Sequence, residues 1–148
     1  DKSKKTIILS PATTWDNKHW TISGWQDLIK KLNGNYNLII TASTKEKELT
    51  SKILEDLKDI NIIDLTGKTS LADLIYIFKN SDLVISPDSG STHTAWAAGA
   101  KSVITLFFST SAKRTAPFGQ NYFYISSDIQ CAPCMKKKCK LKYNKNKT

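Results

Sequence analysis

Four residues that could hold an anion stand close together in the stretch 87–99, PDSGSTHTAWAAG. They are Asp88, Ser89, Gly90 and His93. The stretch follows the apolar run 83–85, which predicts a buried strand, and it leads into small residues that predict a helix. The N–H groups and the positive dipole end of such a helix attract anions, and a glycine allows close approach. We therefore expect a phosphate site at this stretch.

The side chains of this stretch suit different roles. We expect His93 to donate a hydrogen bond to a phosphate oxygen, although a lone histidine also serves in packing or faces solvent. A carboxylate repels phosphate, so Asp88 is expected to accept hydrogen bonds from backbone N–H groups of the following turn. Ser89 and Gly90 would then present their own N–H groups to the anion.

A second polar loop, residues 12–20, follows the apolar run at 6–9. Lys18 carries an ammonium group, a point charge suited to phosphate oxygens, and Thr13 and Thr14 add hydroxyl and N–H donors. A lysine in a loop also commonly serves only as a solvated charge. Loops of this composition at the end of a strand often carry function, so we expect Lys18 to face a ligand.

Short apolar runs alternate with helical patterns along the chain. Strands are expected at 6–10, 36–41, 60–65, 82–86, 102–107 and 122–125. This alternation predicts an α/β fold, a Rossmann-like three-layer domain with a parallel sheet. Right-handed crossovers place all strand-to-helix loops at one edge of the sheet, where such folds bind ligands. The two polar stretches should therefore meet.

Capping residues precede the helical patterns. We expect Ser23 to cap the first helix, Ser43 or Thr44 the second, and Ser70 the third. The second helix is expected to run through about Leu57. The third helix has one apolar stripe, formed by Leu71, Leu74, Ile75 and Phe78. Residues 108–120 are expected to form a loop.

The positive charge is concentrated at one end of the chain. The 148 residues carry a net charge of +9, from 22 Lys and Arg against 13 Asp and Glu. Residues 129–148 hold seven lysines and no acid, which leaves 15 basic and 13 acidic groups, or +2, for residues 1–128. We expect a folded domain at 1–128 and a Cys/Lys-rich tail at 129–148. A tail of this kind contacts an anionic membrane surface, binds nucleic acid or is simply solvated. The near-neutral domain, without aromatic RNA-binding patterns, argues against nucleic acid.

All three cysteines lie in this tail, at Cys131, Cys134 and Cys139. The sequence has no export signal, so a structural disulfide framework is not expected. Three thiolates could bind zinc with a fourth ligand from elsewhere, Cys131 and Cys134 could form a redox-labile pair, or all three could stay reduced. These three interpretations stay open.

Several function classes lack their sequence patterns. There is no GxGxxG fingerprint of dinucleotide binding, and Gly67-Lys68-Thr69 lacks the preceding glycine of a P-loop because Ile62 stands there. There is also no serine-hydrolase triad pattern. No apolar run approaches the ~20 residues of a membrane span, so we expect a cytoplasmic protein. Because the chain begins at Asp1 without Met, we expect a piece of a longer protein.

Four motifs, in this order, are similar to those of one enzyme family. They are PATT-x3-KHW at 11–20, LTGKTSL at 65–71, SPDSG-x2-H-x-A at 86–95 and TLF at 105–107. Together they resemble the C-terminal, donor-binding domain of the ADP-heptose:lipopolysaccharide heptosyltransferases, glycosyltransferase family 9. The resemblance covers residues 6–119, and Cys-x-Pro-Cys in the tail is also similar to many members. It implies the C-terminal half of a GT-B enzyme, whose active site lies between two Rossmann-like domains.

The resemblance also implies roles for individual residues. Residues 1–128 would bind a nucleotide-sugar donor, ADP-heptose, without a cofactor or metal. The donor diphosphate would be held by Thr13, Thr14 and Lys18 from one loop and by Asp88, Ser89, Gly90 and His93 from the other. A glutamate after the second strand, Glu46 or Glu48, would contact the ribose. Thr66 and Gly67 in the turn 65–67 would border the adenine.

The implied reaction inverts the configuration at the anomeric carbon and uses no metal ion. Lys18, His93 and the helix start would stabilise the leaving diphosphate. The general base and the site for a lipid-linked glycan acceptor belong to the N-terminal domain of such enzymes. The chain should therefore bind the donor of lipopolysaccharide core biosynthesis without transferring the sugar, and its tail would contact the inner face of the cytoplasmic membrane. The alternative is a non-catalytic nucleotide-binding module on the same fold.

The sequence departs from the family pattern at two places. Residues 107–110 read Phe-Phe-Ser-Thr, where the family commonly has Phe-Gly-Pro-Thr, and Ser43 stands near a usual glycine. We therefore expect the contact of the loop after the fifth strand with the sugar, and the corner around the ribose, to differ.

Overall fold

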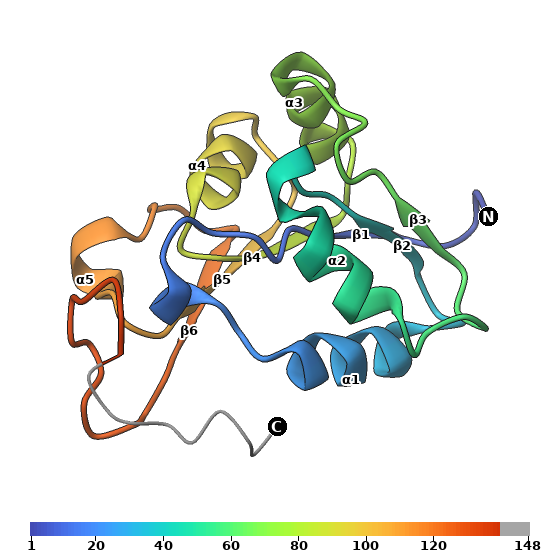
Figure 1. The fold of residues 1–148 in the computed structure, drawn as a ribbon. Helices are drawn as coiled ribbons and strands as arrows, with labels where there is room; N and C mark the ends of the chain where they lie inside the picture. The colour runs from blue at the N-terminus through green and yellow to red at the C-terminus, as the bar shows by residue number, and fades with distance from the viewer. Residues whose placement is uncertain (140–148) are drawn as a thin grey trace.

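A six-stranded parallel sheet forms the centre of the molecule (Figure 1). The computed structural model describes residues 1–139. Its strands are β1 (Thr6–Leu9), β2 (Asn37–Ile40), β3 (Ile62–Asp64), β4 (Leu83–Pro87), β5 (Val103–Phe107) and β6 (Tyr122–Ser126). They lie in the order β3-β2-β1-β4-β5-β6, and every neighbouring pair is parallel. The predicted α/β fold is confirmed, with all six strands close to their expected positions.

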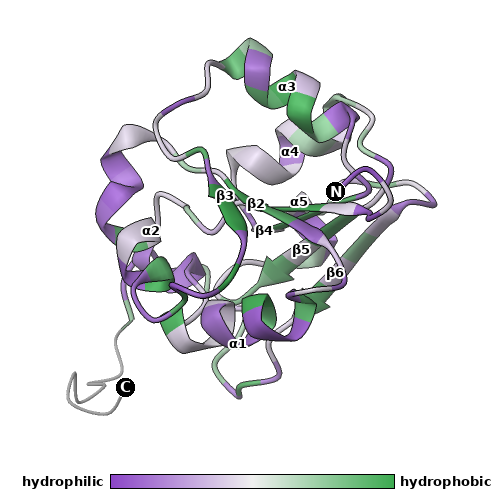
Figure 2. Cartoon of the chain, turned by 90° about the vertical axis from the view of Figure 1, so that its right-hand side faces the viewer, coloured by the Kyte–Doolittle hydropathy of each residue, from purple (hydrophilic) through white to green (hydrophobic). Residues whose placement is uncertain are grey.

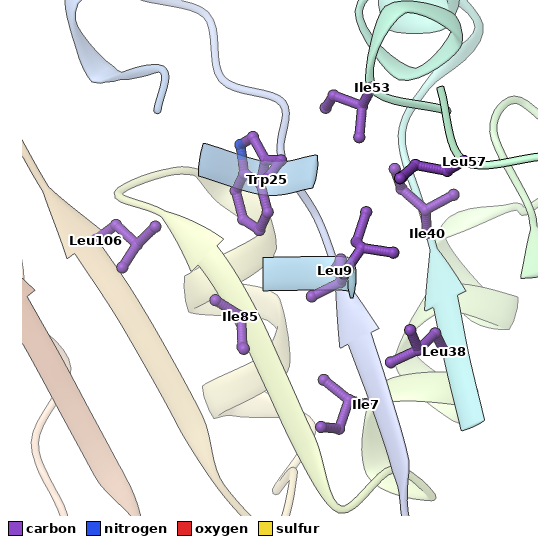
Figure 3. Packing of buried hydrophobic residues seen from close by; sticks show 10 residues of the cluster. Ile7, Leu9, Trp25, Leu38, Ile40, Ile53, Leu57, Ile85 and Leu106 are labelled. Atoms are coloured by element: carbon purple, nitrogen blue, oxygen red, sulfur yellow. The ribbon is translucent and has the colours of Figure 1, made fainter. Parts of the chain in front are cut away.

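Helices cover both faces of this sheet (Figures 1 and 2). One face is covered by α1 (Ile22–Leu32) and α2 (Lys47–Leu54), the other by α3 (Leu71–Lys79) and α4 (Gly90–Ala97). Because strand side chains alternate between faces, Ile7 and Leu9 pack with Trp25 of α1 (Figure 3). Ile8, on the opposite face, packs with Phe78 of α3. Three layers result, and all strand-to-helix loops leave from one edge.

Side-chain caps fix where the helices begin. Thr21, and not the predicted Ser23, caps α1, since its Oγ1 accepts a hydrogen bond from the Gly24 N–H at 3.0 Å. Ser70 caps α3 as predicted, and Asp73 Oδ2 accepts the Ser70 N–H in return at 2.9 Å. Ser43 caps a short 3-10 helix, η2 (Thr44–Glu46), which leads directly into α2.

The structure differs from the sequence prediction in three segments. Helix α2 ends at Leu54 although Leu57 is still buried in the core. The apolar stripe of α3 is only half used, because Phe78 is buried while Leu71 is 66% and Ile75 is 41% exposed. The expected loop 108–120 contains a short helix, α5 (Ala112–Thr115).

The first part of the tail folds back onto two loops of the domain. The Met135 N–H donates to the Ser109 carbonyl at 2.7 Å, and Asn17 Nδ2 donates to the Lys136 carbonyl at 3.1 Å. We call residues 135–137 the strap. The expected boundary at residue 128 stays a prediction. Of the tail lysines, Lys136 and Lys137 belong to the strap, whereas Lys140, Lys142, Lys145 and Lys147 lie outside the described residues.

The cysteines show no bonding partner within residues 1–139. Cys131, Cys134 and Cys139 are free thiols, and no three His, Cys, Asp or Glu side chains in this range gather as metal ligands would. No helix in the same range has the length and apolar character to cross a membrane.

Candidate functional site

A pocket of about 540 Å³ opens at the carboxyl ends of the central strands. It is lined by residues of the loops that follow β1, β2 and β4, together with the first turn of α3. The residues predicted from sequence that line it are Thr13, Thr14, Lys18, Glu46, Asp88, Ser89, Gly90 and His93. The two polar stretches that lie about seventy positions apart in the sequence thus meet in one pocket, as the parallel topology requires.

Asp88 is the buried centre of this pocket. Its side chain is only 4% exposed and its Oδ2 lies 2.9 Å from the Lys18 ammonium. The same oxygen accepts a hydrogen bond from the Thr110 hydroxyl at 2.7 Å, and Oδ1 lies 3.8 Å from His93 Nε2. The predicted role of Asp88 as an acceptor for backbone N–H groups is wrong. Side chains from three separate segments surround the carboxylate, because a buried charge requires charged or strongly polar partners.

The loop after β1 presents Lys18 toward Asp88. A one-turn 3-10 helix, η1 (Asp16–Lys18), ends at this lysine, and its ammonium lies 4.7 Å from the centre of the Trp15 ring. His19 Nε2 lies 2.9 Å from the Thr13 carbonyl oxygen and ties the start of the loop to its end. The Lys18 side chain is 16% exposed, so it is held in place and still reaches the pocket.

Helix α4 begins at the pocket and carries no side-chain cap. Ser89 occupies the N-cap position, but its hydroxyl pairs with the Ser86 hydroxyl at 2.9 Å and not with the helix N–H groups. A Cβ atom at Gly90 would meet no atom within 4 Å, so open space lies in front of this helix start. The first N–H groups of α4 therefore remain available to an anion in the pocket.

The structure separates the two candidate glutamates. Glu46 lines the pocket, and its carboxylate accepts from both the N–H and the hydroxyl of Ser43. Glu48 lies outside the pocket and is exposed, with one oxygen 2.7 Å from Lys52. Of these two, Glu46 is thus the one placed where it could contact a ligand.

The turn after β3 contributes less to the pocket than expected. Thr66 is buried and donates to the Thr50 hydroxyl at 3.1 Å, and neither Thr66 nor Gly67 lines the pocket. Gly67 has a φ of 69°, and a Cβ there would lie 2.7 Å from Thr44 Oγ1, so this turn packs tightly against η2. Ser70 and Leu71 form the adjacent pocket wall instead.

Sequence reasoning missed several hydroxyl residues around the site, and three of them are Ser91, Thr110 and Thr115. Ser91 and Thr115 line the pocket, and Thr110 bonds Asp88 from behind. Thr110 is the last residue of the segment 107–110. The comparison of this segment with the family pattern is the sequence signal that could have identified Thr110. Ser91 and Thr115 carry no motif that would distinguish them from other surface hydroxyls.

The pocket therefore combines a lysine, a histidine and an uncapped helix start at one end, and a glutamate with a small apolar wall at the other. The model of glycosyltransferase family 9 (heptosyltransferase) matches residues 1–145. The chain belongs to glycosyltransferase family 9. Its members in this comparison are longer than the chain, which covers less than half of each relative described below.

Two relatives show the extent of the likeness. The chain is 31% identical over 147 residues to "Lipooligosaccharide heptosyltransferase 2" of Campylobacter jejuni, covering 96% of this chain and 46% of the relative. It is 33% identical over 122 residues to "Lipopolysaccharide core heptosyltransferase OpsX" of Haemophilus influenzae, covering 80% of this chain and 34% of the relative. The chain thus spans at most about half the length of these family 9 enzymes.

Solved structures of the family have the same fold. The Escherichia coli ADP-heptose LPS heptosyltransferase II superposes with a TM-score of 0.76 at 20% identity, covering 93% of this chain and 46% of that one. The E. coli heptosyltransferase WaaC with ADP-2-deoxy-2-fluoro heptose gives 0.71 at 22% identity, covering 89% and 41%. The six-stranded sheet therefore corresponds to part of a GT-B heptosyltransferase.

Proposed function

We propose that this domain binds the nucleotide-sugar donor, ADP-heptose, of a heptosyltransferase of lipopolysaccharide core biosynthesis. The observation that carries the proposal is the meeting of Lys18, His93 and the uncapped start of α4 in one pocket. Membership of family 9 and the likeness to WaaC, whose structure was solved with ADP-2-deoxy-2-fluoro heptose, support the choice of ligand.

The charges of the pocket suit a diphosphate leaving group. Breaking the bond between the sugar and the nucleotide leaves added negative charge on the diphosphate, which must be stabilised in the transition state. Lys18 supplies a fixed positive charge, and His93 and the α4 N–H groups supply hydrogen-bond donors. We propose that Thr13, Thr14, Ser89 and Gly90 complete this phosphate site, and that Glu46 contacts the ribose.

The proposed reaction is inverting and independent of metal ions. In it an acceptor hydroxyl of a lipid-linked glycan, deprotonated by a base elsewhere in the protein, attacks the anomeric carbon. Residues 1–128 would be the donor domain and 129–148 a tail that contacts the inner face of the cytoplasmic membrane. The chain spans 46% of its Campylobacter jejuni relative, so we propose that the 148-residue chain alone binds donor and transfers no sugar.

Calorimetric titration of the chain with ADP and UDP tests the proposal. We expect ADP to bind, and we expect Lys18→Ala to weaken ADP binding about tenfold or more because it removes a charge-assisted contact. Lys31→Ala is the matched control, since Lys31 is an exposed lysine of α1 that does not line the pocket. Absence of ADP binding at millimolar concentration, or equal losses in the two variants, would contradict the proposal.

A further inference from the structure

The carboxylate of Asp88 has an uneven set of partners. Its Oδ2 is shared by the Lys18 ammonium at 2.9 Å and the Thr110 hydroxyl at 2.7 Å. Its Oδ1 accepts no hydrogen bond from the described residues, and His93 Nε2 lies 3.8 Å from it. Two donors on one oxygen fix the rotation of the carboxylate, and that rotation sets where Lys18 and His93 stand.

Thr110 holds this carboxylate from outside the pocket. It is 5% exposed, does not line the pocket that contains Lys18, and instead lines a separate cavity between β5 and the tail. We therefore expect a ligand in the main pocket to contact Asp88 and not Thr110, so that Thr110 acts on the ligand through Asp88.

The backbone just before Thr110 is held by two hydrogen bonds. The preceding residue, Ser109, accepts a hydrogen bond from the Met135 N–H of the strap at 2.7 Å. Phe107, at the end of β5, accepts one from the Ser127 N–H at 2.8 Å. The hydroxyl thus comes from an anchored segment, so its direction toward Asp88 is set by the fold and not by a free loop.

We propose that Thr110 is a positioning residue for the phosphate site and acts by holding the Asp88 carboxylate. A lysine ammonium has three N–H donors. Because Thr110 already donates a hydrogen bond to Asp88 Oδ2, Lys18 keeps only one of its N–H donors on Asp88. It turns the other two toward a diphosphate. Without the hydroxyl, the buried carboxylate draws Lys18 and His93 toward itself and away from the ligand. This inference rests on the proposed function.

The test compares three variants of the chain. Thr110→Val removes the hydroxyl at nearly constant volume, Thr110→Ser restores it, and Ser81→Ala is a control that removes another buried hydroxyl. Ser81 bonds the Phe78 carbonyl at 2.8 Å next to the start of β4, at the end of the sheet away from the pocket. ADP and adenosine are titrated into each protein, with thermal unfolding recorded in parallel.

We expect Thr110→Val to weaken ADP binding about tenfold and to leave adenosine binding unchanged, because the lost contact acts on the phosphates. Thr110→Ser should bind ADP as the unmodified chain does, and Ser81→Ala should bind both ligands normally. Unchanged ADP binding by Thr110→Val, or an equal loss of ADP and adenosine, would overturn the inference. If the unmodified chain bound no ADP, the proposed function itself would fail.

Discussion

Asp88 places a negative charge inside a site proposed for a diphosphate, and its neighbours explain why this is tolerated. The carboxylate is paired with Lys18 and bonded by Thr110, so the group as a whole is close to neutral. A buried lysine without such a partner would itself be costly, because burial penalises an unpaired charge. Asp88 therefore holds the cation in place, and the uncapped start of α4 adds donors that carry no counter-charge.

The two glutamates after β2 offer a test at the residue scale. Glu46→Gln should weaken ADP binding about fivefold, since an amide is a poorer acceptor than a carboxylate for ribose hydroxyls. Binding of 2′,3′-dideoxy-ADP, which lacks those hydroxyls, should not change. Titration of both nucleotides measures the effect.

Glu48→Gln is the matched control for this test. Glu48 stands two residues away but lies outside the pocket, paired with Lys52. We expect the Glu48→Gln variant to bind ADP with the same affinity as the unmodified chain. A loss in Glu48→Gln, with none in Glu46→Gln, would contradict the placement of the ribose contact at Glu46.

Residue types were easier to predict than their partners. The sequence allowed a phosphate site to be predicted at Lys18 and Asp88, because both follow apolar strands whose ends must meet. It did not reveal that Asp88 bonds Thr110, which lies 22 residues further along the chain. Local reasoning favours a bond to the next turn for any aspartate before a helix, and only the packed structure brings β5 beside β4 at this point.

The strap connects two of the elements that carry the site. It joins the η1 segment through Asn17 and the segment after β5 through Ser109. Lys18 follows Asn17 directly and Thr110 follows Ser109 directly, so the two residues that contact Asp88 Oδ2 each stand next to a strap contact. We predict that Asn17→Ala loosens the strap and lowers ADP affinity about two- to threefold, as expected for one exposed hydrogen bond.

Hydrogen exchange of the Met135 amide gives a direct measurement of this prediction. The amide donates to Ser109, so it should exchange faster in Asn17→Ala. Asn35→Ala is the control, because Asn35 is an exposed residue after α1 and lies away from both the strap and the pocket. Unaltered exchange at Met135 would mean that the strap does not depend on Asn17.

At the element scale, periodicity predicted the strands well and the helix faces less well. Strands buried on both sides read as continuous apolar runs, so β1, β4 and β5 were evident. The apolar stripe of α3 predicted that Leu71 and Ile75 are core residues, but both are exposed. Leu71 borders the pocket instead. An apolar stripe shows that a face is hydrophobic, but it cannot tell a core contact from a ligand contact or an exposed surface.

The sheet as a whole is tied together at its amino end by Asp82. This carboxylate, next to the start of β4, accepts from the Lys101 ammonium at 2.8 Å and from the Thr6 N–H at 2.9 Å. It thereby joins the segment before β5 to the first residue of β1. The Lys101 contact, followed by the Thr6 hydrogen bond, lowers the pKa of the Asp82 carboxyl below its ordinary value.

This lowered pKa predicts a pH-dependent contribution to the free energy of unfolding. The stabilisation is complete above the ordinary aspartate pKa, about 3.9, and is lost as the pH falls through the lowered value. Asp82→Asn should therefore reduce the free energy of unfolding by about 1 kcal/mol at pH 7. The difference between the two proteins should shrink toward zero in strong acid, and urea unfolding at pH 7 and at about pH 2 measures both quantities.

Glu48→Gln is the control for this prediction. It shows whether removing any carboxylate beside a lysine would change the free energy of unfolding in the same way. The contact with Lys52 also lowers the pKa of Glu48, but the pair sits on the exposed side of one helix, α2, and joins no separate strands. Exposed pairs of this kind contribute little because water and salt screen them. We expect no measurable change in unfolding for Glu48→Gln at either pH. An equal loss in both variants would mean that net charge, and not the junction of β1, β4 and β5, sets the acid stability of this molecule.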